Sequence, residues 1–146
     1  MEMIEEFAKD VSNFLVIECP AISFDSSKLR SKTQMAALFN GVLYLKEGIK
    51  EDYNLFFAIA HELRHVWQLQ NDEDFYFGNY KPRPELDLES YNLQPAEIDA
   101  NAFAGLVMEE CFGIEILFNG MSDIVKAKIY ARMNYLDEKL FGAVYE

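Results

Sequence analysis

One apolar segment, residues 55–67, constrains the fold of this chain more than any other part. It reads LFFAIAHELRHVW and predicts a helix from Tyr53 to about Gln70, capped by Glu51 or Asp52. Its apolar residues cover two sides of that helix: Leu55, Ile59, Leu63 and Val66 on one, Phe56, Ala60 and Trp67 on the other. A helix that is apolar over so wide an arc is expected to be buried.

The only two histidines of the chain, His61 and His65, lie within this segment. On a helix they are about 40° apart around the axis, and Glu62 is about 100° from His61. This H-E-x-x-H pattern is typical of helices in which both histidines bind zinc and the glutamate acts as a base. Because buried polar groups need partners, a metal ion would supply one; the alternative is a core helix with two satisfied histidines. Arg64 lies outside the arc and is expected to be a surface or ion-pair residue.

A catalytic zinc has three protein ligands, so a third must come from another segment. Pro95 suits the first position of a helix and Gly113 the end of one, which predicts a second helix between them. On it Glu97 shares a face with small or flexible residues: Ala100, Asn101, Ala104 and Met108. Asp99 points about 200° away from Glu97. We therefore expect Glu97 to be the third ligand; Cys111, near the far end of this helix, is the weaker candidate.

The N-terminal part predicts a helix followed by a small sheet. Apolar periodicity indicates a helix over residues 2–13, after which residues 14–18 become strand-like and residues 22–24 alternate as a short strand does. The pair Asn40-Gly41, within residues 35–45, predicts a hairpin because both residues tolerate the positive φ angles of a two-residue turn. We expect a mostly antiparallel sheet, whose edge either pairs with an extended peptide or only completes the core.

The C-terminal part predicts one more helix. Residues 71–94 are irregular and join the two helices that carry the candidate ligands, and residues 114–118 are apolar without a clear assignment. Ser122 is expected to cap a last helix that ends near Gly142. Its core face would carry Val125, Ile129, Met133, Leu136 and Leu140. With the parts above, residues 1–146 predict a single α+β domain.

Charge limits the partners of the chain. There are 13 Lys and Arg against 25 Asp and Glu, a net charge of −12, which repels phosphate backbones and anionic lipid. We expect neither a nucleic acid nor a membrane as a partner. Residues 1–7 lack the features of a signal peptide and no apolar run reaches the length of a membrane span, so we expect a cytoplasmic protein. Cys19 and Cys111 are too few for a disulfide framework and are expected to be buried thiols.

These residues together predict the hydrolysis of a peptide or protein substrate. One zinc ion would lower the pKa of a bound water, and Glu62 would take its proton and pass it to the leaving amine. Tyr76, Tyr80 and Tyr91 are candidates to donate a hydrogen bond to the tetrahedral intermediate, with aromatic packing as the alternative. Asn101 is a candidate to orient the ligands. Two histidines and a carboxylate also bind iron in oxygenases, but the helical spacing favours zinc.

The motifs resemble those of known peptidases. The pairing of residues 61–65, HELRH, with a downstream helical glutamate is similar to zinc metallopeptidases whose third ligand is Glu, and residues 97–104, EIDANAFA, resemble the E-x-x-A-N-x-F-A signature of the ImmA/IrrE-like peptidases. That family is linked to phage, mobile elements and regulator cleavage. The resemblance implies a minimal zincin-like domain with three metal ligands and one catalytic base: His61, His65 and Glu97, with Glu62. The alternative is a non-catalytic module with this fold that regulates a partner.

Overall fold

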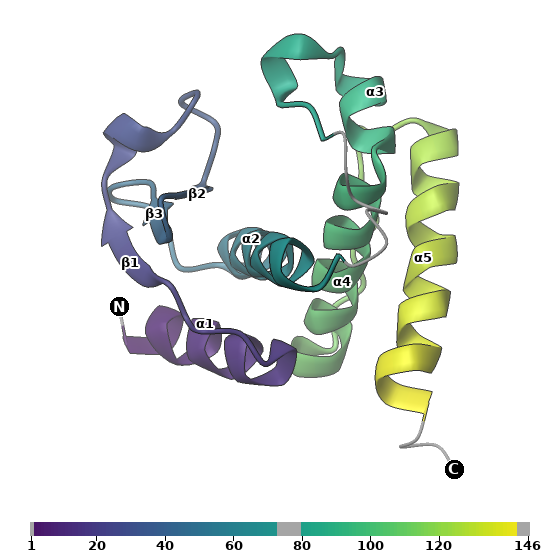
Figure 1. Ribbon diagram of the computed structural model, residues 1–146, viewed down its shortest axis with the longest axis horizontal. Coiled ribbons are helices and arrows are strands. Elements are labelled where there is room, and N and C mark those ends of the chain that lie inside the picture. Colours follow the sequence, from purple (N-terminus) through teal and green to yellow (C-terminus); the bar gives the residue numbers. More distant parts are fainter. Residues whose placement is uncertain (1, 73–79, 143–146) are drawn as a thin grey trace. The chain divides into compact units, whose positions relative to one another are not determined.

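The computed structural model describes residues 2–72 and 80–142, and within them the chain forms five α-helices and one three-stranded sheet (Figure 1). The predicted α+β class is therefore confirmed. The chain divides into two compact units, Met1–Trp67 and Gln68–Glu146, and each is described here by itself. That residues 1–146 act as one domain stays a prediction.

The first unit begins with helix α1, Glu2–Leu15. The helix predicted over residues 2–13 is confirmed, but it runs two residues further because Leu15 is buried on its apolar face. The strand-like reading of residues 14–18 is wrong. Val16 has a φ of 57° and is 86% exposed, and the N–H of Ile17 donates to the carbonyl of Ser12 at 3.0 Å. This left-handed residue ends the helix and turns the chain toward the sheet.

The sheet has the order β1-β3-β2, from strands β1 (Ala21–Phe24), β2 (Ala36–Phe39) and β3 (Val42–Leu45). β2 and β3 are antiparallel and joined by Asn40 and Gly41, whose φ angles of 50° and 77° confirm the predicted hairpin. β1 pairs with β3 in parallel, so the sheet is mixed and the expectation of a mostly antiparallel sheet is wrong. The parallel pair arises because β2 forms on the far side of β3 from β1.

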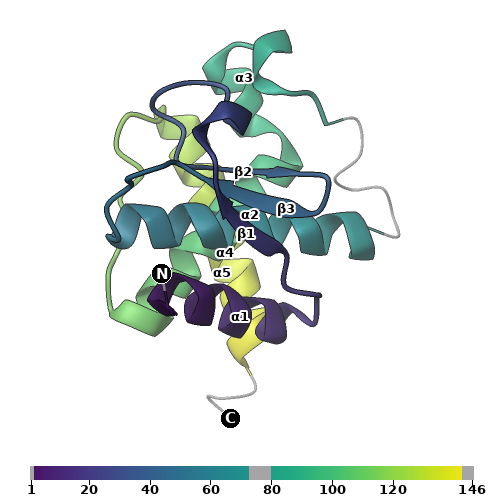
Figure 2. The same cartoon turned by 90° about the vertical axis from the view of Figure 1, so that its left-hand side faces the viewer.

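Helix α2, Tyr53–Asn71, confirms the predicted central helix. The Asp52 side chain caps it by accepting the N–H of Leu55 at 3.2 Å. The core face of α2 is buried and consists of Leu55, Ile59 and Leu63. Two residues of β3 are buried as well, Leu43 and Leu45. The strands lie in front of α2 in the view of Figure 2. Phe7 of α1 meets Phe56 of α2 edge to face, with ring centroids 4.9 Å apart.

The second unit contains the last turn of α2, the short helices η2 (Arg83–Glu85) and α3 (Leu88–Leu93), and two long helices, α4 (Pro95–Phe112) and α5 (Asp123–Phe141). Both predicted long helices are confirmed. Gly113 ends α4 with a φ of 65°, and the Ser122 hydroxyl caps α5 by accepting the N–H of Val125. Every residue from Ala96 to Met108 is buried.

α4 and α5 lie side by side and run in the same direction, and residues 113–122 return along them (Figure 1). The 18 residues of α4 span about 27 Å, a distance that ten extended residues can cover. This explains why residues 114–118 form neither a helix nor a strand. The close packing uses Gly105, where an added Cβ would meet Met133 at 3.2 Å and Phe118 at 3.3 Å.

The structure bears on two further predictions, which concern membrane-spanning segments and the burial of the cysteines. Among the residues that the structure covers, no helix has the length and apolar character to cross a membrane. Cys19 and Cys111 are both exposed, so the prediction of buried thiols is wrong. Cys111 lies in the last turn of α4, after the buried stretch that ends at Met108, where the helix emerges into solvent.

Candidate metal centre

His61 and His65 lie one turn apart on α2, and both side chains are half-buried. Their Nε2 atoms are 3.1 Å apart and their ring centroids 4.8 Å apart. With zinc–nitrogen bonds of about 2.0–2.1 Å in a tetrahedral site, two ligand nitrogens are separated by about 3.3–3.4 Å. The two imidazoles therefore already have nearly the spacing that a shared metal ion requires.

Glu97 lies in the first turn of α4 and is 2% exposed. The hydroxyl of Tyr80 donates a hydrogen bond to its Oε2 at 3.3 Å. Burial, and then the negative charge of Glu97, raise the pKa of Tyr80 well above its ordinary value of 10.0. Tyr80 therefore remains a hydrogen-bond donor at neutral pH. Because a carboxylate offers two oxygens, this bond is compatible with metal binding by Glu97.

The predicted ligands come together as one group. His61, His65 and Glu97 each offer one ligand atom, and these atoms all lie within 4.8 Å of one another. This group could bind a metal ion, and among the described residues it is the only group of three or more His, Cys, Asp or Glu side chains with that property. Cys111, the weaker candidate for the third ligand, does not belong to it.

Glu62 and Arg64, which lie between the two histidines, differ in their burial. Glu62 follows His61 directly and is half-buried. Arg64 is 2% exposed, so the surface alternative of its prediction is wrong, and the ion-pair alternative stays a prediction. Its guanidinium lies 3.7 Å from the ring centroid of Trp67, three residues along α2. Such stacking accommodates a buried arginine, and the Arg–x–x–Trp spacing is a signal for it in the sequence.

Of the three candidate tyrosines, Tyr80 and Tyr91 can be placed, while Tyr76 lies outside the described residues. The hydroxyls of Tyr80 and Tyr91 are 2.8 Å apart. Since Tyr80 has a single hydroxyl hydrogen and gives it to Glu97, Tyr91 must be the donor in this pair. Two reciprocal bonds between Lys81 and Gln94, of 2.7 Å and 3.0 Å, hold the chain beside Tyr80 against the start of α4. Tyr80 is thus held beside Glu97 by bonds on both sides.

Asp99 was expected to point away from Glu97, and its contacts agree with that. Its carboxylate is 0% exposed and accepts bonds from Gln68 Nε2 at 2.9 Å, Arg132 Nε at 2.9 Å and Arg132 Nη2 at 2.8 Å. Gln68 Nε2 also donates to the carbonyl of Ala96 at 2.9 Å. No sequence pattern predicts this network, because its members are separated by more than 30 residues and only folding brings them together.

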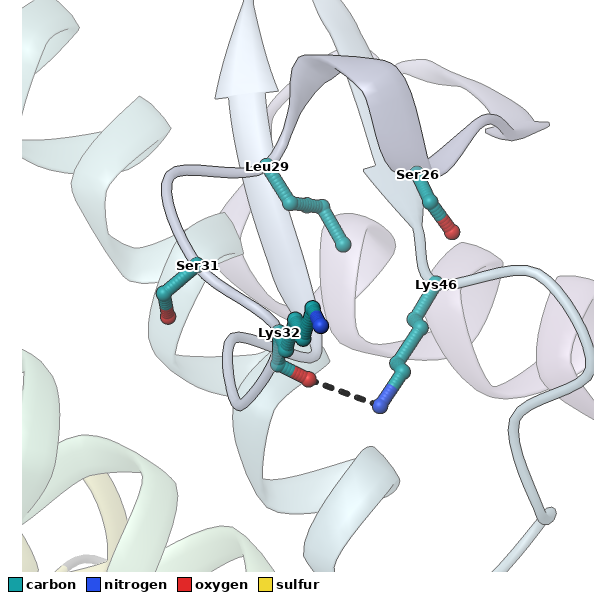
Figure 3. A pocket seen from close by; sticks show the side chains of 5 residues that line it. All are labelled: Ser26, Leu29, Ser31, Lys32 and Lys46. Atoms are coloured by element: carbon teal, nitrogen blue, oxygen red, sulfur yellow. Dashed lines mark hydrogen bonds between the residues drawn. The ribbon is translucent and has the colours of Figure 1, made fainter.

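The structure also has a pocket of about 440 Å³ in the first unit, lined by Ser26, Leu29, Ser31, Lys32 and Lys46 (Figure 3). The Nζ of Lys46 donates to the carbonyl of Lys32 at 2.7 Å and so fixes the lysine side chain across the pocket wall. None of the predicted site residues lines it.

The donor set of the group is two imidazole nitrogens and one carboxylate oxygen. These donors suit zinc and also other first-row transition metals, so the set by itself leaves the identity of the metal open. No protein-family model, curated protein or solved structure matches this chain.

Proposed function

We propose that this chain is a zinc-dependent metallopeptidase with narrow specificity, which cleaves a peptide or protein substrate. The observation that carries the proposal is the convergence of ligand atoms from His61, His65 and Glu97 within 4.8 Å of one another. The spacing of the two Nε2 atoms, 3.1 Å, is compatible with two nitrogens that bind one metal ion. Glu62, which completes the H-E-x-x-H pattern, distinguishes a hydrolytic site from a purely structural one.

Each residue has a role that follows from its chemistry. Bound zinc would polarise the substrate carbonyl and lower the pKa of a water molecule toward neutrality. Glu62 accepts a proton from that water and delivers it to the amine that leaves when the peptide bond breaks. Tyr80, whose hydroxyl stays protonated, donates its one hydrogen to Glu97 in this structure; it would exchange that bond for one to the carbonyl oxygen as that oxygen gains negative charge.

The first test is the metal content of the purified protein. Elemental analysis should find close to one zinc per chain, and His61→Ala or Glu97→Ala should reduce this to a small fraction, because two ligands hold zinc far more weakly than three. Exclusive recovery of iron would overturn the assignment to zinc. A wild-type chain that binds no divalent metal at all would overturn the proposed function itself.

The second test separates metal binding from catalysis. Glu62→Gln removes the base without removing a ligand, so it should retain zinc and lose cleavage of a peptide library by at least about a hundredfold. Glu110→Gln is the matched control, because it removes the same charge from an exposed position on α4. Zinc binding by the wild type without cleavage of any peptide would contradict the peptidase and favour the non-catalytic binding module.

A further inference from the structure

Beyond the ligands, the second unit contains a buried polar network made of Gln68, Asp99 and Arg132. It joins three helices: the last turn of α2, the first turns of α4, and α5. Asp99 is 0% exposed and Gln68 4% exposed, while 21% of the Arg132 side chain is accessible. Burial of this kind is stable only when each polar group is satisfied, and the three residues satisfy one another.

The bonding pattern leaves little freedom to Gln68. The amide nitrogen has two hydrogens, and they go to the carbonyl of Ala96 and to Oδ2 of Asp99, each at 2.9 Å. The two acceptors flank Glu97, one residue before it and two residues after it. Gln68 therefore fixes the short stretch of backbone from which the Glu97 side chain projects.

Arg132 fixes the other side of Asp99. Its Nε and Nη2 both approach Oδ1, at 2.9 Å and 2.8 Å, while Gln68 binds Oδ2. With both oxygens engaged, the carboxylate can neither rotate nor move along α4. Arg132 also stacks on Tyr135 of its own helix, with its Cζ 4.6 Å from the ring centroid, which limits the rotamers of the guanidinium.

The network lies close to the ligands along both helices, within one turn on α2 and about half a turn on α4. Gln68 comes three residues after His65, a step of about 4.5 Å along α2, and Asp99 comes two residues after Glu97. Within the second unit, the bond from Gln68 to the carbonyl of Ala96 fixes the start of α4 against the last turn of α2. Metal ligands must be held within about 0.5 Å of their working positions, which single side chains on unbraced helices do not achieve.

The geometry points to Gln68, Asp99 and Arg132 as positioning residues that hold Glu97 in place for metal binding. This inference rests on the proposed function, because it assigns the network to the same metal centre. None of the three belongs to the group of candidate ligands. They act through Glu97, by fixing the backbone on either side of it.

The test is zinc affinity, measured by competition with a chromophoric chelator on the full chain at a temperature well below unfolding. Gln68→Met keeps the length and burial of the side chain but removes both donated bonds, and it should weaken zinc binding by about tenfold. Arg132→Met should do the same, and Arg132→Lys should recover part of the loss. The visible spectrum of the cobalt-substituted protein should change in Gln68→Met, because the carboxylate ligand is displaced.

Ile129→Ala is the matched control. Ile129 is fully buried on α5, one turn before Arg132, so its truncation destabilises the same helix without touching the network. It should leave zinc affinity within about twofold of the wild type. Wild-type affinity in Gln68→Met and Arg132→Met, or an equal loss in Ile129→Ala, would overturn the inference and leave the metallopeptidase proposal intact. A wild-type chain without zinc affinity would instead overturn that proposal.

Discussion

Replacing Arg132 by methionine should lower the free energy of unfolding by about 3 kcal/mol. The substitution removes two donors, at 2.9 Å and 2.8 Å, from a carboxylate that is 0% exposed. Hydrogen bonds to a charged group contribute about 1.5–3 kcal/mol each, and breaking a buried pair costs about 3–5 kcal/mol. The lower end applies because 21% of the Arg132 side chain is exposed, so water already weakens the pair.

A double-mutant cycle with Asp99→Asn, followed by urea unfolding at pH 7, isolates the pair from other contacts of Arg132. The stacking of Arg132 on Tyr135 is lost in Arg132→Met whatever stands at position 99, so it cancels in the cycle. We expect a coupling energy of at least about 1.5 kcal/mol between the two positions. A coupling near zero, or a loss below about 1 kcal/mol in Arg132→Met, would show that the pair of Arg132 and Asp99 does not stabilise the second unit.

Four further predictions concern metal binding, a cap, pH and a turn. Zinc at about a hundred times its dissociation constant should stabilise the chain by about 2.7 kcal/mol in thermal unfolding, and a chelator should reverse the effect. Ser122→Ala should cost about 1 kcal/mol in the same assay, because the hydroxyl accepts the N–H of Val125, while Ser122→Thr should cost less. Hydrogen bonds from Ser90 hold the pKa of Asp87 in the folded chain below its ordinary value of 3.8. The contribution of Asp87 to stability is therefore complete at a pH above 3.8 and is lost as the pH falls through the lower pKa of the folded chain. Asp87→Asn should therefore make unfolding less pH-dependent below about pH 4, as measured by urea unfolding across an acid series. Gly41→Ala should cost about 1 kcal/mol from its φ of 77° alone, because nothing lies within 4 Å of the added Cβ; an unchanged urea midpoint would contradict this.

Local signals in the sequence predicted much of the fold. The structure has the turn predicted from Asn40-Gly41 and the helix start predicted from Pro95. It also has the helix end predicted from Gly113 and the cap predicted from Ser122, and each of these signals acts within a few residues. The failure at Val16 has a local cause as well. Its β-branched side chain favours a strand, but burial of Leu15 extends α1 and leaves Val16 to end the helix with a positive φ. Packing of one neighbour thus overrides the intrinsic preference of the next.

The candidate metal group could be predicted because its pattern is short. His61 and His65 are separated by one helical turn, and Glu97 is the acidic residue on the small-sided face of the next long helix. The environment of the group could not be predicted in the same way. Arg132 reaches Asp99 only through the parallel packing of α4 and α5, and the position of Tyr80 beside Glu97 depends on the pair formed by Lys81 and Gln94. Neither contact joins residues at a spacing in the sequence that is typical of a motif.

The burial of α4 affects how the chain folds while it is being synthesised. Residues Ala96–Met108 leave the ribosome before α5, the helix that packs along α4 and supplies buried residues such as Val125 and Ile129. Until α5 has emerged from the ribosome, the nascent chain carries α4 without that cover. Such a helix is a substrate for chaperones and a nucleus for aggregation. Fragments that stop before Ser122 should therefore accumulate in inclusion bodies, however well the preceding residues fold.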